Sequence, residues 1–374
     1  MIPKVQQDSV STKHFLILML IAYLFSIAVR FIWIDFIEAD PRNFFNGEVM
    51  INTNDGYAYA EGARDILAGF HQEGDKSYVD HAGSIVTAWV AKLLPFSFET
   101  IILYIPGFLG SLLIIPIMLI GRSLGLTWVG FVAGLLGGIA WSYYNRTMFG
   151  YYDTDMMTIV LPTISMYALI LTTVTQKNRF LVLLTASVLF YMWWYPAGKS
   201  LLFAMAIMSL LYTVVFDRKN LFNYKIPTFI FIGLLPLLPL LLKLLLAIGL
   251  FGFFHKLREQ ADKFILPLLA TLFVVYLSLG GLNSITHTLK AYVFKDTVTD
   301  LASTDSLKYY SVVQTVREAS AIPFETFANR ISGSQVGFFF SLLGFALLAF
   351  HYRVMLLALP MIGLGFLAYK NGLR

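Results

Sequence analysis

The stretch FLILMLIAYLFSIAVRFIW, residues 15–33, decides the fold class of this chain. A predominantly apolar run of this length is what a helix needs to cross the hydrocarbon core of a bilayer. The run follows a polar start containing Lys4 and Lys13, and it lacks the small-residue pattern of a signal-peptide cleavage site. We therefore interpret it as a retained membrane-spanning helix.

Runs of the same kind recur along all 374 residues, and the composition agrees with them. Hydrophobic residues make up 58% of the chain and charged residues only 13%, whereas soluble domains carry about 25% charged residues. These values exclude a soluble globular enzyme, a disordered chain and, with no cysteine, a disulfide scaffold. They also exclude an outer-membrane barrel, whose strands would alternate in short segments.

The later apolar runs predict an all-α polytopic membrane protein with about eleven transmembrane helices. The run at 227–254 is too long for one straight span and has basic segments on both sides, so we expect a helical hairpin turning near Pro239–Lys243. The other runs are 100–121, 126–141, 156–174, 180–195, 200–216, 264–279, 336–350 and 354–369.

The distribution of charge predicts the orientation of these spans. With a cytoplasmic N-terminus, the inside segments carry 12 basic and four acidic residues, and the rest of the chain carries 15 basic and 18 acidic residues. This is the positive-inside asymmetry of inserted helical bundles, and it accounts for the net charge of +5. No basic patch with interleaved aromatic residues is present, so we expect the chain to contact a lipid bilayer and no nucleic acid.

Two long polar segments, about residues 34–99 and 280–335, fall on the external side of this topology. Loops of this length are usually functional. We therefore expect the functional groups of this chain to lie on the external side of the membrane.

Three groups of carboxylates lie on this same predicted side. They are Asp55 in the stretch NTNDGY, the pair Asp153 and Asp155 directly before an apolar run, and Glu318 in the stretch TVRE. Taken singly, each has an ordinary interpretation as a turn residue, a helix cap or a solvated side chain. Taken together they favour a hard divalent cation, Mg²⁺ or Mn²⁺, because such ions prefer oxygen ligands.

These motifs in this order resemble the bacterial single-subunit oligosaccharyltransferases of the PglB type, which belong to the GT-C class of glycosyltransferases. The resemblance covers nearly the whole chain. It rests on TNDGYA with EGARD at 53–65, SYYNRT at 142–147, GYYDTDM at 150–156, WWYP at 193–196, YVFK at 292–295, TVRE at 315–318, RIS at 330–332 and GLR at 372–374.

The resemblance implies roles for individual residues. Asp55, Asp153 and Glu318, with Asp155 beside them, resemble the family's metal ligands, and Asp55 and Glu318 would also hold the acceptor carboxamide. Arg146 resembles the arginine that braces this acidic site, so Asp55, Glu318 and Arg146 form the predicted catalytic set. Three residues resemble substrate-binding groups: Arg374 and Tyr292 for the lipid pyrophosphate, and Arg330 for the acidic residue two positions before the acceptor asparagine.

The resemblance also implies that the whole chain, 1–374, is one transmembrane catalytic domain in the bacterial inner membrane, with its active site facing the periplasm. The implied activity is metal-dependent transfer of a glycan, with inversion, from a polyprenyl-pyrophosphate donor to asparagine in a D/E-x-N-x-S/T sequon. The family's C-terminal periplasmic domain and its WWDYG motif do not occur in this sequence. We therefore expect the chain to be either a truncated form or one part of a split enzyme, whose partner would be a separate C-terminal domain. In both cases we expect this chain alone to be inactive or nearly so. By its position, we expect the segment from Trp193 to Tyr195 to belong to an aromatic belt at the outer interface.

Two alternatives remain open at the level of sequence. One is another GT-C enzyme that uses a polyprenyl-phosphate sugar, which would share the acidic motif of the first loop without needing Glu318 or Arg330. The other is a transporter or flippase. Transporters often contain internal repeats and charges near the midplane, and this sequence shows no repeat of fixed period.

Overall fold

The structure is a computed structural model, and it describes residues 8–257, 259–288 and 322–370. Within these residues the chain is almost entirely helical. The strands are β1 (Phe44–Phe45) and β2 (Glu48–Val49), which pair antiparallel as a short hairpin. The predicted all-α class is confirmed.

Five helical stretches in the described residues are long and apolar enough to cross a membrane. A sixth candidate is the pair α18 (Phe324–Ser332) and α19 (Gln335–His351), which is bent by 66°. The predicted count of about eleven crossings also includes several of the shorter apolar helices. The five long stretches are Thr12–Glu38, Phe98–Ser123, Asp155–Thr175, Pro196–Phe216 and Leu240–Leu257.

The helices fall into two compact units, which are joined through α9 (Val160–Thr175) and α10 (Asn178–Trp194). The N-terminal unit comprises residues 4–167 and 193–196, and the C-terminal unit comprises 168–192 and 197–374. Short elements complete the chain: η1 (Pro41–Asn43), α7 (Trp141–Asn145), α8 (Asp155–Thr158), η2 (Pro196–Gly198), η3 (Leu221–Tyr224), α14 (Glu259–Asp262) and η6 (Arg353–Ala358).

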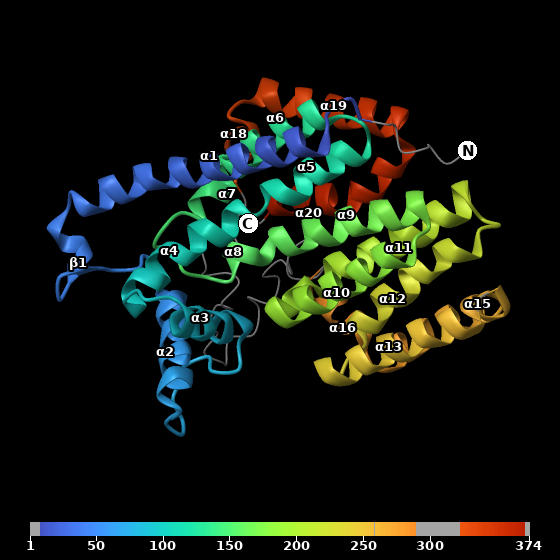
Figure 1. Cartoon of the computed structure of the whole chain (residues 1–374), viewed down its shortest axis with the longest axis horizontal. Helices are drawn as coiled ribbons and strands as arrows, with labels where there is room; N and C mark the ends of the chain where they lie inside the picture. The colour runs from blue at the N-terminus through green and yellow to red at the C-terminus, as the bar shows by residue number, and fades with distance from the viewer. Residues whose placement is uncertain (1–7, 258, 289–321, 371–374) are drawn as a thin grey trace, which may run out of the picture. The chain divides into compact units, whose positions relative to one another are not determined.

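In the N-terminal unit, the long helix α1 (Thr12–Glu38) packs along α4 (Phe98–Ser111), α5 (Ile114–Ser123) and α6 (Thr127–Gly138) (Figure 1). The backbones of α5 and α6 approach closely, since a Cβ on Gly121 would lie 2.6 Å from the Gly130 Cα. Small residues at such contacts let backbones meet, which favours helix packing in lipid. This bundle supports the segment that follows α6.

The predicted external loop 34–99 contains two helices, α2 (Asn54–Ala68) and α3 (Ala82–Leu93), which pack against each other. A Cβ on Gly62 would fall 2.6 Å from the backbone of Tyr78, so the return segment between the helices lies directly on α2. The segment is therefore an ordered helical pair over these residues.

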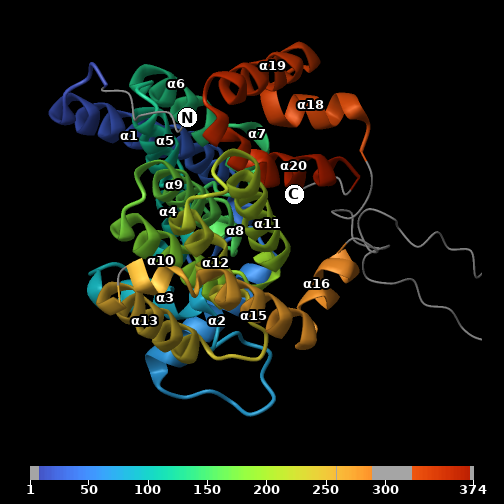
Figure 2. The same ribbon diagram turned by 90° about the vertical axis from the view of Figure 1, so that its right-hand side faces the viewer.

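In the C-terminal unit, α12 (Lys225–Leu234) packs against α11 (Lys199–Phe216), α13 (Leu240–Leu257) and α15 (Ile265–Ser278) (Figure 2). Helix α16 (Gly281–Thr288) follows α15, and α20 (Leu359–Lys370) packs against α11. Every residue of α12 is buried. It is the central helix of this unit.

The hairpin predicted for 227–254 is confirmed, because α12 and α13 are separate helices in contact. The break covers residues 235–239 and includes Leu237 at a φ of +61°. Lys243 lies just inside α13, where its Nζ donates a hydrogen bond of 2.8 Å to the Gly233 carbonyl of α12. The lysine thereby satisfies a carbonyl at the C-terminal end of α12.

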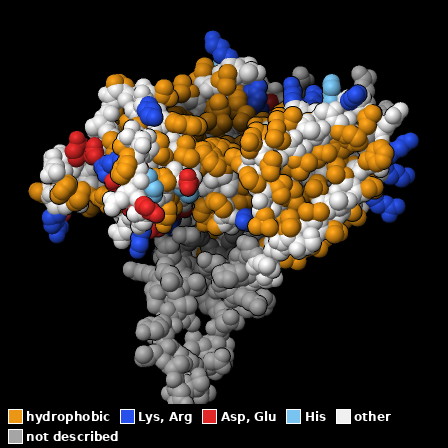
Figure 3. Space-filling view, turned by 90° about the horizontal axis from the view of Figure 1, so that it is seen from below, with side chains coloured by type: hydrophobic (Ala, Val, Ile, Leu, Met, Phe, Trp, Pro, Cys, Tyr) orange, Lys and Arg blue, Asp and Glu red, His pale blue; other side chains and the backbone are white. Residues whose placement is uncertain are grey.

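Apolar side chains are exposed along the spans, and Figure 3 shows how much of the visible surface they cover. Only 28% of the most apolar window of α1 is buried, and only 11% of that of α13. Contiguous apolar surface on this scale requires a covering that is not water. Lipid contact along these helices explains it, in agreement with the predicted multi-pass membrane protein.

Candidate functional site

The segment between α7 and α9 carries Arg146, Asp153 and Asp155, and the N-terminal unit holds it firmly. Gly150, at a φ of +81°, donates its N–H to the Leu103 carbonyl of α4 at 2.7 Å. Phe149 is fully buried beside it. Tyr152, also buried, donates its hydroxyl to Thr87 of α3 at 2.6 Å. The two aspartates therefore follow an anchored turn.

Residues on both sides of Asp55 in the sequence contact this turn. The Thr53 hydroxyl donates a hydrogen bond of 2.8 Å to the Tyr152 carbonyl, across 99 residues of sequence. A Cβ on Gly56 would lie 2.4 Å from the same carbonyl oxygen. Because Thr53 and Gly56 flank Asp55 and Tyr152 precedes Asp153, the structure brings these two predicted ligands together.

Arg146 and Asp155 form an ion pair in which the Arg146 Nε donates to Asp155 Oδ2. Both side chains are about one-sixth exposed, at 17% and 16%, and the Arg146 guanidinium lies 5.2 Å from the centre of the Tyr151 ring. Arg146 was predicted to brace the acidic site. The structure gives it Asp155 as its carboxylate partner.

Asp153 lacks such a cation: among the residues that the structure describes, none forms an ion pair with it. Its Oδ1 accepts hydrogen bonds from the Thr154 N–H at 2.5 Å and the Thr154 hydroxyl at 3.1 Å. Burial raises the pKa of the Asp153 carboxyl, and the negative charge of Asp155 raises it further. The positive charge of Arg146 acts in the opposite direction and lowers the pKa of Asp153.

The donor set fits Mg²⁺ or Mn²⁺. Asp55, Asp153 and Asp155 offer only hard oxygen donors, the type that these ions take. All three carboxylates affect Tyr59 of α2. Burial raises the pKa of this tyrosine, and the negative charges of Asp153, Asp55 and Asp155 raise it further. The charges of all three carboxylates therefore act on this one tyrosine, and Arg146 pairs with Asp155.

The other predicted site residues are placed differently. Glu318, Tyr292 and Arg374 lie outside the described residues. Arg330 lies in the last turn of α18, before Gly333 at a φ of +78°, and is partly buried in the C-terminal unit. Of the predicted set, Asp55, Arg146, Asp153 and Asp155 are therefore the residues that the structure brings together.

Trp194 is a correction to the predicted aromatic belt. Its side chain is only 1% exposed, and its indole N–H donates a hydrogen bond of 2.8 Å to the carbonyl of Thr154, between the two aspartates. A belt residue would instead place its ring at the bilayer surface. No local pattern distinguishes these cases, because an aromatic residue at a span end fits both.

His81 is a second residue near the site that the sequence analysis did not single out. Its ring packs against Tyr59, at 4.7 Å between centroids, and lies 6.4 Å from that of Trp194. The Nδ1 atom accepts the Gly83 N–H at 3.0 Å, which caps α3. Burial lowers the pKa of His81, which favours its neutral form.

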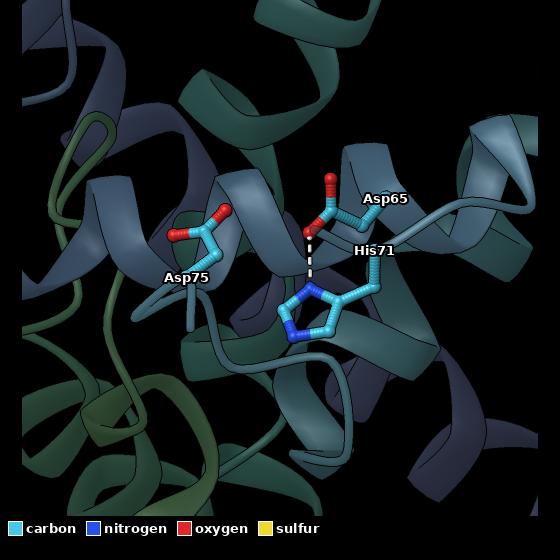
Figure 4. A group of neighbouring side chains, drawn as sticks. All are labelled: Asp65, His71 and Asp75. Atoms are coloured by element: carbon cyan, nitrogen blue, oxygen red, sulfur yellow. Dashed lines mark hydrogen bonds and ion pairs between the residues drawn. The ribbon is translucent and has the colours of Figure 1, made fainter. Parts of the chain in front are cut away.

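A separate cluster of Asp65, His71 and Asp75 lies at the end of α2 (Figure 4). His71 Nδ1 is 2.8 Å from Asp65 Oδ2, and the Ser77 hydroxyl donates to the same oxygen at 2.7 Å. Asp75 accepts the Ser77 N–H at 3.2 Å. These hydrogen bonds fasten the return segment to α2 and account for the arrangement.

Comparison with known proteins identifies the family. The family described as oligosaccharyl transferase STT3, N-terminal, matches residues 10–374. The chain belongs to the STT3 family. The resemblance read from the motifs is thereby confirmed, and family membership favours the oligosaccharyltransferase interpretation over the two alternatives.

Relatives and solved structures agree with this assignment. The chain is 40% identical over 359 residues to the undecaprenyl-diphosphooligosaccharide–protein glycotransferases of two Campylobacter jejuni strains, over 96% of this chain and 50% of theirs. The archaeal oligosaccharyltransferase from Archaeoglobus fulgidus has the same fold, with a TM-score of 0.61 at 16% identity, over 96% of this chain and 47% of that one. The chain thus spans about half the length of these relatives.

Proposed function

We propose that this chain is the membrane part of an N-oligosaccharyltransferase. It would transfer a glycan from a polyprenyl-pyrophosphate donor to the asparagine of a D/E-x-N-x-S/T sequon. The observation that supports the proposal is the hydrogen bond from Thr53 to the Tyr152 carbonyl, which joins the segment carrying Asp55 to the segment carrying Asp153 and Asp155. Family membership supports it from a second direction, because the Campylobacter relatives are named for this class of donor and for a protein acceptor.

The chemical difficulty of this reaction is the acceptor, because the lone pair of an amide nitrogen is delocalised into its carbonyl. Asp55 and Glu318 would accept hydrogen bonds from the carboxamide N–H₂ and fix it for attack on the anomeric carbon. The new carbon–nitrogen bond forms as the bond from that carbon to the pyrophosphate oxygen breaks, with inversion. One amide proton passes to a carboxylate of the site.

Asp55, Asp153, Asp155 and Glu318 would hold Mg²⁺ or Mn²⁺, which would fix the carboxylates and stabilise the charge that develops on the leaving pyrophosphate. Arg146 would neutralise Asp155 and set its orientation. Arg374 and Tyr292 would bind the pyrophosphate, and Arg330 the acidic residue at position −2 of the sequon. The active site would face the periplasm.

The decisive test is an assay with lipid-linked oligosaccharide and an Asp-x-Asn-x-Thr peptide. The purified chain is assayed with and without the C-terminal domain of a Campylobacter relative, because we expect the chain alone to be nearly inactive. EDTA should abolish transfer and Mn²⁺ should restore it. Asp55→Asn and Asp153→Asn should each lower the rate about 100-fold or more.

Asp35→Asn is the matched control, since Asp35 is exposed on α1 in the N-terminal unit. It should transfer at the wild-type rate. Transfer that resists EDTA, or that survives Asp153→Asn in folded protein, would contradict the proposal. Glu318→Gln separates asparagine transfer from a GT-C enzyme that uses a polyprenyl-phosphate sugar, because only the former depends on Glu318.

A further inference from the structure

Arg30 is a charged residue inside the first membrane span, and neither the fold nor the proposed mechanism explains it. It lies in α1, whose apolar window has a mean hydropathy of 2.5, and its side chain is fully buried. A charge within a transmembrane helix is costly and usually marks a functional position. Its contacts should therefore indicate its role.

The guanidinium is bound by neutral oxygens. Its Nε donates to the Thr147 carbonyl at 2.9 Å and its Nη2 to the Thr147 hydroxyl at 2.6 Å. Its Nη1 donates to the Ser26 carbonyl and hydroxyl, at 3.0 and 2.5 Å. Within the described part of the chain no carboxylate pairs with Arg30, and the rings of Tyr143 and Tyr144 lie 6.0 and 5.6 Å from its Cζ.

Through these contacts the planar guanidinium of Arg30 holds one residue, Thr147, in a fixed position. Two of its nitrogens bind the backbone and the side chain of Thr147 at once, which a lysine ammonium could not reproduce in this geometry. On the other side, α4 leaves room for the same turn. A Cβ on Gly110 would lie 2.5 Å from Thr147 Cβ, and one on Gly107 would lie 3.1 Å from Arg30 Cδ.

Thr147 directly follows Arg146, the cation that pairs with Asp155. Fixing the Thr147 backbone therefore fixes where the Arg146 side chain starts and which carboxylate it reaches. We propose that Arg30 is a positioning residue of the carboxylate site, which holds the turn after Tyr143 so that Arg146 stays on Asp155. This inference rests on the proposed function, since the site is the one assigned there.

The structural part of the test needs no catalysis. In the purified full chain, Arg30→Met should accelerate amide hydrogen exchange in peptides covering residues 142–157. Arg122→Met is the matched control, because Arg122 also contacts α1, through Thr12 and Phe15, but away from the carboxylates. Equal acceleration in both variants, or none in Arg30→Met, would overturn the proposal.

The catalytic part is a double-mutant cycle with Arg146→Met in the peptide assay. Arg30→Met should lower kcat about tenfold or more with little change in the peptide KM, because a small displacement of a reacting group is enough for such a loss. The double variant should be no slower than Arg146→Met alone, since both changes remove the same positioning. Independent losses that multiply would overturn the assignment.

Two further variants keep the test decisive. Arg30→Lys keeps the charge but loses the planar guanidinium, and Thr147→Val removes only the hydroxyl contact, so both should accelerate exchange in 142–157. If Arg30→Met does not accumulate as folded protein, these two are judged by the same criteria. A wild-type chain that never transfers glycan would defeat the proposed function, while the exchange result would still decide the role of Arg30.

Discussion

At the scale of single residues, the site depends on backbone contacts so close that no side chain fits between them. Gly56 follows Asp55 in α2, and a Cβ there would lie 2.3 Å from the Thr53 hydroxyl and 2.4 Å from the Tyr152 carbonyl. Real Cβ atoms do not approach backbone oxygens so closely. Glycine is therefore what allows the first external segment to dock on the turn that carries Asp153.

Gly56→Ala should separate these two segments. Overpacking of this kind destabilises a protein by about 1–3 kcal/mol. We expect a lower melting temperature in detergent and weaker Mn²⁺ binding by electron paramagnetic resonance. Gly249→Ala is the control, because Gly249 has no neighbouring atom within 4 Å of a new Cβ. If Gly56→Ala behaved like Gly249→Ala, the docking contact would be unimportant.

The pH dependence of cation binding should report on Asp153. A cation needs the ionised carboxylate, and burial together with Asp155 raises the pKa of Asp153. Affinity should therefore fall, as the pH is lowered, at a higher pH than for an ordinary aspartate with a pKa of about 3.9.

Asp155→Asn removes the negative neighbour, so the pKa of Asp153 drops and the loss of Mn²⁺ binding should move to lower pH. Titrations of Mn²⁺ affinity against pH measure the midpoint in wild type, in Asp155→Asn and in the control Asp35→Asn. An unchanged or higher midpoint in Asp155→Asn would be inconsistent with coupling between the two aspartates.

At the scale of elements, polar side chains at helix ends form hydrogen bonds to backbone groups near the site and in the spans. Trp194, at the C-terminal end of α10, donates to the Thr154 carbonyl, and His81 caps α3 beside it. Lys243 of α13 plays a similar part in the C-terminal unit, where it satisfies the Gly233 carbonyl of α12. In lipid each such backbone group must find a partner within the protein.

Trp194→Phe keeps the ring but removes the indole N–H. The lost hydrogen bond should lower stability by about 1 kcal/mol and loosen the peptide between Asp153 and Asp155. Thermal unfolding and Mn²⁺ affinity should both fall. Trp89→Phe serves as the comparison, since Trp89 is 58% exposed on α3 and should tolerate the change. Equal effects in the two variants would refute the specific role of Trp194.

At the scale of the whole molecule, membrane topology follows from charge and apolar length together. The chain contains no cysteine, so single-cysteine reporters can be introduced without a background. Glu73 lies in the first external segment and Lys219 between α11 and η3, and both are exposed. The positive-inside rule assigns them to opposite sides of the bilayer.

In intact cells, a membrane-impermeant maleimide should label Glu73→Cys and leave Lys219→Cys unmodified until the membrane is opened. Glu73 follows α2, the helix that carries Asp55. This result would therefore place the carboxylate site outside the cytoplasm. Labelling of Lys219→Cys in sealed cells would reverse the orientation and remove the periplasmic active site from the proposal.

The sequence by itself determined the fold class and the hairpin between α12 and α13, because a long apolar run is a local signal. It predicted about eleven crossings, whereas five or six stretches of the described residues are long and apolar enough to cross a membrane. It also supplied the motifs that led to the STT3 family. Only the tertiary structure showed the contact between the segments that carry Asp55 and Asp153. It also showed that Trp194 is buried rather than part of an aromatic belt, and that Arg30 binds Thr147. Those contacts join residues far apart in the chain, through hydrogen bonds and close packing that no local periodicity records.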